Sequence, residues 1–141
     1  MEKYFAIFHD ISAVGLIAAT VAIILTSALW YSHLLFGKSW RRLSGIRLGD
    51  MSASDIRRGY SFQSIVAILQ ATLIAIIVEH VQDHLGAILG AIGLVWLFIL
   101  LELSNRSIWE RQPIALFLLH ALRALAALLA CAITYSIVRT L

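Results

Sequence analysis

The sequence predicts an all-α integral membrane protein, a four-helix bundle with antiparallel up-down topology. Two observations predict this class. Of the 141 residues, 61% are hydrophobic and 13% are charged, whereas soluble domains average about 45–50% and about 25%. The charged residues also separate apolar stretches, each long enough to cross roughly 30 Å of hydrocarbon. Since lipid offers no hydrogen bonds, these stretches must be helices or strands of a closed barrel. The alternating ten-residue strands of a barrel are absent.

The apolar stretches predict a single transmembrane domain over residues 1–141. The connection between the second and third spans is very short, and the next connection is only slightly longer. Short connections make successive helices antiparallel neighbours. The four predicted spans are residues 11–32, 60–78, 85–103 and 113–138.

The long connection, residues 33–59, is basic and contains a signal for the start of the second helix. Ser52 and Asp55 have the spacing of a capping box, so we expect this helix to begin near Ala53. Pro113 suits the first turn of the fourth helix, where a backbone N–H is not needed.

Basic residues predict how the bundle is oriented. Most of the Lys and Arg residues lie in the first and third connections, the second connection holds none, and the tails hold Lys3 and Arg139. The positive-inside rule therefore places the first connection inside and both termini on the outer side of a cell inner (cytoplasmic) membrane. A basic inner face that meets anionic lipid accounts for the net charge of +3. We therefore expect no nucleic-acid partner.

Two sequence motifs carry a family resemblance. The first reads WYSHLLFGKSW from Trp30 to Trp40, and the second reads NRSIWERQP from Asn105 to Pro113. Both resemble a family of small four-helix membrane proteins catalogued as domain of unknown function 1761, whose members often have proline where this chain has His33. The resemblance implies four helices and a bacterial membrane, and it supplies no activity.

The chemistry of the first motif indicates a membrane–water interface. The rings of Trp30 and Tyr31 combine an apolar body with a polar tip, which is favoured at the membrane surface. Gly37 lets the chain turn as it leaves the bilayer, and we expect Trp40 to face the lipid. We interpret the motif as an interfacial anchor, with a binding role as the alternative. Its candidate residues are Trp30, Tyr31, His33, Gly37, Lys38 and Trp40.

The fourth span contains two ionisable residues, His120 and Arg123, which share a helix face. Small residues continue this face, so Arg123 should point into the bundle. An unpaired arginine there costs at least about 2.5–3.5 kcal/mol, and we expect Glu102 to be its partner. Such a group could bind an anionic or polar ligand, relay protons, or only fix the helix register. The predicted polar seam, in the inner half of the bundle, consists of Glu102, Asn105, His120, Arg123, Gln63 and Gln70.

On the outer side, the second connection combines histidines and carboxylates. Four-residue spacing would suit a divalent metal on an unbroken helix, but the chain must reverse here. We therefore favour a short solvated turn and predict no metal site and no cofactor. The weak candidates for metal ligands are Glu79, His80, Asp83 and His84.

The third span opens with Gly86, Gly90 and Gly93, which permit close helix contact. We expect them to pack within the bundle, with dimerisation as the alternative. The indole N–H of Trp96, deep in the same span, needs a hydrogen-bond partner.

The sequence contains no nucleophile–base pair, strong metal motif or nucleotide loop. We therefore favour a non-enzymatic binding, accessory or small transport component, for which transport would require a homo-oligomer. One alternative is a membrane enzyme for a lipid or hydrophobic substrate, with Glu102 or His120 as acid or base. Another is a structural subunit of a larger membrane complex. A cavity reaching Glu102 and His120 would favour the first two, and a solid core with a Glu102–Arg123 pair the third.

Overall fold

The computed structural model describes residues 11–46, 52–81 and 84–141, and these residues form helices and no strand. Four helices are long and apolar enough to cross a membrane. They are α2 (Ala13–Trp30), α4 (Ala53–His80), α5 (Leu85–Trp109) and α6 (Ile114–Val138). A short helix, α3 (Gly37–Ser44), follows α2. The predicted all-α class, with four helices that could span a membrane, is confirmed.

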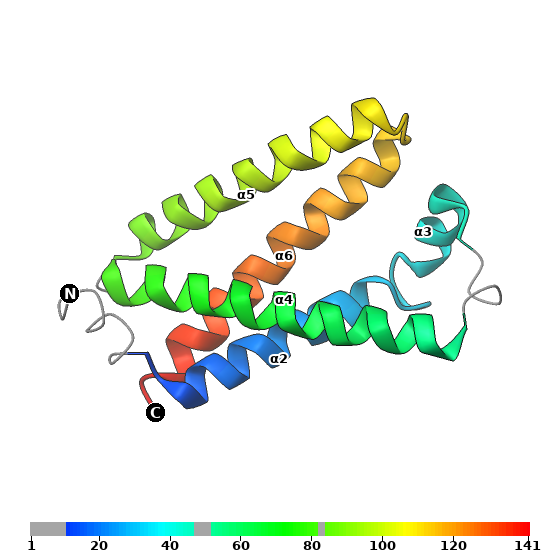
Figure 1. Cartoon of the computed structure of the whole chain (residues 1–141). Helices are drawn as coiled ribbons and strands as arrows, with labels where there is room; N and C mark the ends of the chain where they lie inside the picture. Colours follow the sequence, from blue (N-terminus) through cyan, green and yellow to red (C-terminus); the bar gives the residue numbers. More distant parts are fainter. Residues whose placement is uncertain (1–10, 47–51, 82–83) are drawn as a thin grey trace, which may run out of the picture.

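The long helices run in alternating directions, and α6 lies in the middle of the bundle (Figure 1). α6 packs most extensively against α2 and also contacts α3, α4 and α5. α5 packs mainly against α6 and has little contact with α4. α3 and the α5–α6 connection lie at one end of the bundle, and the end of α4, the start of α5 and the C-terminus lie at the other (Figure 1). We call these the α3 end and the C-terminal end.

The helix boundaries follow from local capping. Ser52 caps α4 through its side chain, which accepts from the Asp55 backbone N–H at 3.2 Å, while the Asp55 carboxylate accepts from the Ser52 N–H at 3.2 Å. The predicted capping box and helix start are therefore confirmed. Pro113 is the N-cap of α6, one residue before the predicted first turn. α5 extends past the predicted residue 103 to Trp109, because a helix continues beyond its apolar stretch while its polar residues remain hydrogen-bonded.

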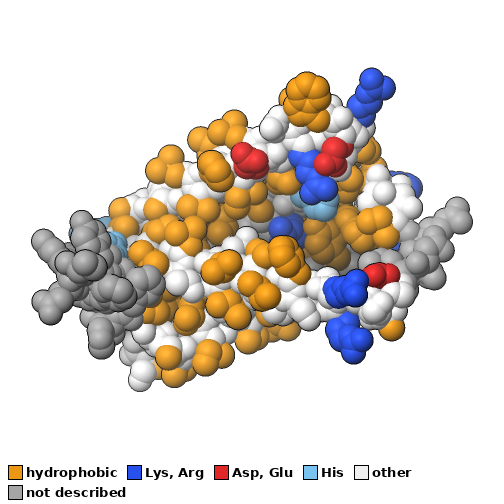
Figure 2. All heavy atoms as spheres, viewed as in Figure 1, with side chains coloured by type: hydrophobic (Ala, Val, Ile, Leu, Met, Phe, Trp, Pro, Cys, Tyr) orange, Lys and Arg blue, Asp and Glu red, His pale blue; other side chains and the backbone are white. Residues whose placement is uncertain are grey.

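Small side chains let α2, α4 and α6 approach closely. Ala19, Ala67, Ala71 and Ala75 are fully buried in the core, together with Cys131. Small residues at helix contacts allow close backbone packing, which drives helix association in lipid. Large apolar side chains instead cover the outside of the bundle along its length (Figure 2). This distribution suits a protein whose solvent is a bilayer.

The glycines of α5 do not pack within the bundle as expected. A Cβ atom built on Gly86, Gly90 or Gly93 meets no atom within 4 Å. α5 contacts the bundle through a different face, which carries Ile88 and Ile92. The glycine face therefore points away from the other helices of this chain.

A hydrogen-bonded clasp joins three helices at the C-terminal end. The Tyr135 hydroxyl donates to Glu79 Oε1 at 2.7 Å and accepts from the Ser12 backbone N–H at 3.2 Å. Arg139 Nη1 lies 2.8 Å from Glu79 Oε2, with the two side chains only 13% and 19% exposed. Gly15 makes room for the Tyr135 ring, since a Cβ there would lie 3.0 Å from Cε2. The clasp fixes the start of α2 against the ends of α4 and α6.

The turn from α2 into α3 requires a glycine. The Gly37 backbone N–H donates to the Ser32 carbonyl at 2.9 Å. A Cβ on Gly37 would lie 2.3 Å from the Tyr31 carbonyl oxygen and 2.6 Å from that of Ser32. Backbone atoms cannot yield to such a contact, so the turn must open if any side chain is added.

We therefore predict that Gly37→Ala lowers the free energy of unfolding by about 1–3 kcal/mol, the usual cost of overpacking. The matched control is Gly90→Ala, where a methyl group enters open space. This control should be neutral or should stabilise the helix by up to about 1 kcal/mol. Unfolding of both variants in mixed detergent micelles measures the difference. Equal stability of the two variants would contradict the proposed backbone contact.

Candidate functional site

A polar cluster lies between α2 and α6 towards the α3 end. The Tyr31 hydroxyl lies 2.7 Å from His120 Nδ1, and Arg123 Nη1 donates to the Ser27 hydroxyl at 3.1 Å. Ser27 is 9% exposed, and the other three side chains are half-buried. We call Ser27, Tyr31, His120 and Arg123 the Arg123 cluster.

Helix periodicity brings these four residues together. Ser27 and Tyr31 are four residues apart at the end of α2, and His120 and Arg123 are three residues apart on α6. Both spacings place side chains on one helix face. Because α2 and α6 are antiparallel and form the most extensive contact in the bundle, the two faces meet at this level.

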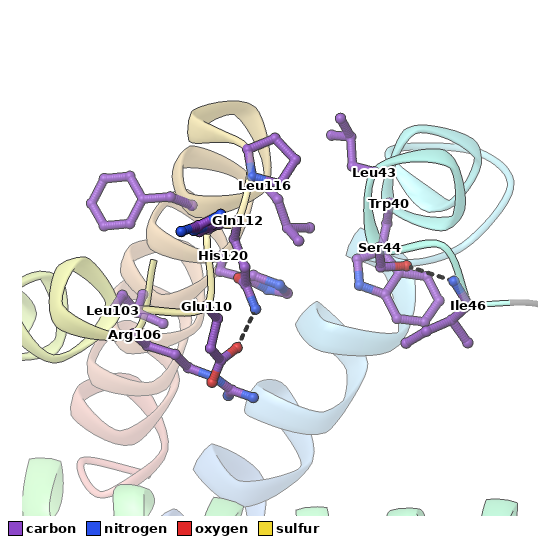
Figure 3. A pocket seen from close by; sticks show the side chains of 13 residues that line it. Trp40, Leu43, Ser44, Ile46, Leu103, Arg106, Glu110, Gln112, Leu116 and His120 are labelled. Atoms are coloured by element: carbon purple, nitrogen blue, oxygen red, sulfur yellow. Dashed lines mark hydrogen bonds and ion pairs between the residues drawn. The ribbon is translucent and has the colours of Figure 1, made fainter. Parts of the chain in front are cut away.

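The Arg123 cluster adjoins a cavity of about 410 Å³ at the α3 end. Its wall comes from α3, the last turns of α5, the α5–α6 connection and the start of α6 (Figure 3). His120 belongs to both the cluster and the cavity wall. The lining residues are Trp40, Leu43, Ser44, Ile46, Leu103, Arg106, Glu110, Arg111, Gln112, Pro113, Leu116, Phe117 and His120.

Trp40 faces the cavity and not the lipid, which corrects our expectation. Its ring centroid lies 5.3 Å from that of Tyr31, at a tilt of 53°. The short helix α3 that carries Trp40 folds back onto α6, which the sequence did not predict. The remaining motif residues lie at the turn, where Trp30 packs against Phe36 at 4.7 Å and Arg41 donates to His33 Nδ1 at 3.0 Å. Lys38 is exposed.

A small charge network forms part of the cavity wall. Arg106 Nε lies 2.8 Å from Glu110 Oε1, and Gln112 Nε2 donates to Glu110 Oε2 at 2.6 Å (Figure 3). Both carboxylate oxygens of Glu110 are therefore occupied. Arg111 has a positive φ of 51°, an uncommon conformation outside glycine, at the point where the chain turns from α5 into α6.

The structure does not pair Glu102 with Arg123. Glu102 is exposed on α5 and makes no ion pair within the described residues, whose two ion pairs are Arg106–Glu110 and Glu79–Arg139. The exposed Glu102 side chain lies outside the bundle, whereas Arg123 is half-buried between α6 and α2. The neighbour of Arg123 is α2 instead, which supplies the Ser27 hydroxyl.

The other predicted seam residues do not join the Arg123 cluster. Asn105 is exposed. Gln63 and Gln70 are half-buried on α4, and neither forms a hydrogen bond with any side chain that the structure describes. Of the six predicted seam residues, the structure therefore brings together only His120 and Arg123. Trp96 lies outside the seam and donates its indole N–H to the Ala121 carbonyl at 2.9 Å.

The candidate metal ligands at the C-terminal end either bond to other side chains or lie on different helices. Both oxygens of Glu79 belong to the clasp with Tyr135 and Arg139. α4 ends at His80, and His84 is the N-cap of α5. The part of the chain that the structure describes contains no group of three or more potential ligands. Asp83 lies outside the described residues.

The comparison with known proteins supports the sequence resemblance. A family model described as a protein of unknown function (DUF1761) matches residues 14–136. The chain belongs to this family. The DUF1761 match includes both sequence motifs, the Arg123 cluster and all residues of the cavity wall. No curated protein and no solved structure matches the chain.

The sequence marked Tyr31 as an interfacial residue, but it placed neither Tyr31 nor Ser27 in the polar seam. Ser27 and Tyr31 share a face of the first span, and that signal was readable. The sequence did not indicate that this face meets the fourth span. Thr20, on the same face, instead bonds to the Leu16 carbonyl of its own helix at 2.8 Å.

We predict that a double-mutant cycle of Tyr31→Phe and His120→Ala gives a coupling free energy of about 0.5–1.5 kcal/mol, typical of a hydrogen bond. Glu102→Gln and Arg123→Met should instead add within about 0.3–0.5 kcal/mol, because these residues do not interact. Reversible unfolding in mixed micelles measures both cycles. A larger coupling for Glu102 and Arg123 than for Tyr31 and His120 would contradict the observed arrangement.

Proposed function

We propose that this DUF1761 membrane protein is a non-enzymatic binding component that holds a small ligand in the cavity at the α3 end. One observation carries the proposal: the cavity of about 410 Å³ is lined in equal part by apolar side chains and by polar groups, which include His120 and Arg106. Its volume lies within the roughly 300–1,000 Å³ of small-molecule sites. Of the two residues expected at such a cavity, His120 lines it and Glu102 does not.

The hydrogen bonds around His120 favour binding over catalysis. Its Nδ1 atom is engaged by Tyr31, a contact that holds the ring in one orientation. The thiol of Cys131 is fully buried in the core, and the hydroxyl of Tyr135, the titratable group among the buried residues of its cluster, is bonded to Glu79 and Ser12. The described polar groups therefore resemble a fixed recognition surface more than a nucleophile with its base.

The middle of the bundle argues against transport by a single chain. Between the Arg123 cluster and the clasp at the other end, the described core residues are apolar, and they include Ile23, Ile74, Leu128 and Cys131. A polar solute would have to cross this layer without hydrogen-bonding partners, which is costly. Binding from the α3 end is the function that this distribution of polar groups supports.

We also propose that the protein lies in a bacterial inner membrane with the α3 end inside. Exposed basic residues at this end support the proposal, among them Lys38, Arg42, Arg57 and Arg58. Such residues are enriched on the cytoplasmic side and can interact with anionic lipid.

This orientation predicts the activity of a reporter enzyme that functions only outside the cytoplasm. Fused after Leu141, the reporter should be active. Inserted after Gly45, it should be inactive. The opposite pattern would invert the orientation and would place the cavity on the outer side.

The cavity proposal predicts that native mass spectrometry of the gently purified protein detects a retained small molecule. Ser44→Trp should abolish retention, because Ser44 lines the cavity and an indole would fill it. The matched control is Ser61→Trp, at an exposed position on α4, which should retain the molecule. Retention by Ser44→Trp would locate the ligand elsewhere. Chemical conversion of the molecule during incubation would favour the enzyme alternative.

A further inference from the structure

We propose that the ligand of this cavity carries a phosphate oxyanion, either as free phosphate or as a lipid headgroup. This inference rests on the proposed function, because it assigns a chemical class to the ligand of the same cavity. Its starting point is the guanidinium of Arg123, a cation inside a predicted membrane span.

The charge of Arg123 is not compensated within the described part of the chain. Arg123 lies ten residues after Pro113, which is about 15 Å along the helix and near mid-membrane. Among the described residues, its guanidinium donates a hydrogen bond only to the neutral hydroxyl of Ser27. No described carboxylate forms an ion pair with it. A guanidinium has five N–H donors, and a charge in a low-dielectric interior calls for a counter-ion.

The Arg123 cluster influences the cavity through the tautomer of His120. The phenol of Tyr31 keeps its proton at neutral pH, and a neutral imidazole has one bare nitrogen that can accept it. The phenol proton is then directed to His120 Nδ1, 2.7 Å away. This leaves the neutral imidazole with its proton on Nε2. Since His120 lines the cavity, it presents a donor to a ligand, and a donor suits an oxyanion.

The wall of the cavity is also basic. Arg106 and Arg111 both line it, together with His120. Among the lining residues that the structure describes, the one acid is Glu110, whose carboxylate oxygens contact Arg106 and Gln112. The terminal nitrogens of Arg106 form no hydrogen bond with any described residue, so they can bind a phosphate, for which arginine has suitable geometry.

The experiment uses the full chain in neutral detergent, stripped of lipid. The probes are inorganic phosphate and nanodiscs of phosphatidylglycerol, with phosphatidylcholine nanodiscs as the zwitterionic comparison. We expect Arg123→Gln to weaken binding of the effective probe at least tenfold. The matched control is Arg58→Gln, at an exposed position on α4, which should change binding less than twofold. Binding of inorganic phosphate indicates the free anion as the ligand. Binding of phosphatidylglycerol without binding of inorganic phosphate indicates a lipid headgroup.

A second measurement does not depend on the folding of a charge variant. The ¹⁵N chemical shifts of the His120 ring in the unmodified protein report the tautomer, with the signal assigned by its loss in His120→Gln. We expect a protonated Nε2, and we expect its shift to change when the effective probe is added. A proton on Nδ1, or equal binding by Arg123→Gln and Arg58→Gln, would overturn the inference.

The failure of this inference is distinguishable from the failure of the proposed function. A retained neutral molecule that is lost in Ser44→Trp but kept in Arg123→Gln would leave the binding function in place and overturn the anion. Absence of any retained molecule, and of any response to the probes, would overturn both.

Discussion

The contact between α2 and α6 is the constraint on which the rest of the molecule depends. Small residues bring the two helices together along their middle, and polar contacts fix them at both ends. At the C-terminal end, the Tyr135 hydroxyl accepts a hydrogen bond from the Ser12 backbone N–H and donates one to the Glu79 carboxylate. At the α3 end, Tyr31 meets His120. In lipid, where apolar burial gives no preference for one helix over another, close packing and hydrogen bonds of this kind determine which helices associate.

The ionisable groups of the bundle are handled in two different ways. At the C-terminal end, Glu79 and Arg139 neutralise each other in a largely buried pair. Inside the bundle, the guanidinium of Arg123 donates a hydrogen bond only to the Ser27 hydroxyl among the described residues. A closed ion pair serves stability, whereas an uncompensated charge beside a cavity has remaining capacity to bind. The capacity to bind a ligand is therefore expected at the α3 end and not at the C-terminal end.

The sequence predicted the helical elements well, because length, hydropathy and caps are local properties. Ser52 and Asp55 located the start of α4 correctly, and the two motifs identified the family. It also identified His120 and Arg123 as intramembrane groups. The partner of Arg123 could not be predicted, since the choice between α2 and α5 depends on which helix packs closest to α6. The fold of α3 back onto α6, which brings Trp40 to the cavity, depends in turn on the tight turn at Gly37.

The position of α5 at the edge of the bundle has a mechanical consequence. Its apolar stretch, residues 85–103, is about 28 Å long, which matches the hydrocarbon of an average bilayer. The last turns of α5 contribute Leu103 and Arg106 to the cavity wall, and α5 is held mainly by α6 alone. The side of the cavity that α5 forms is therefore braced by a single helix contact.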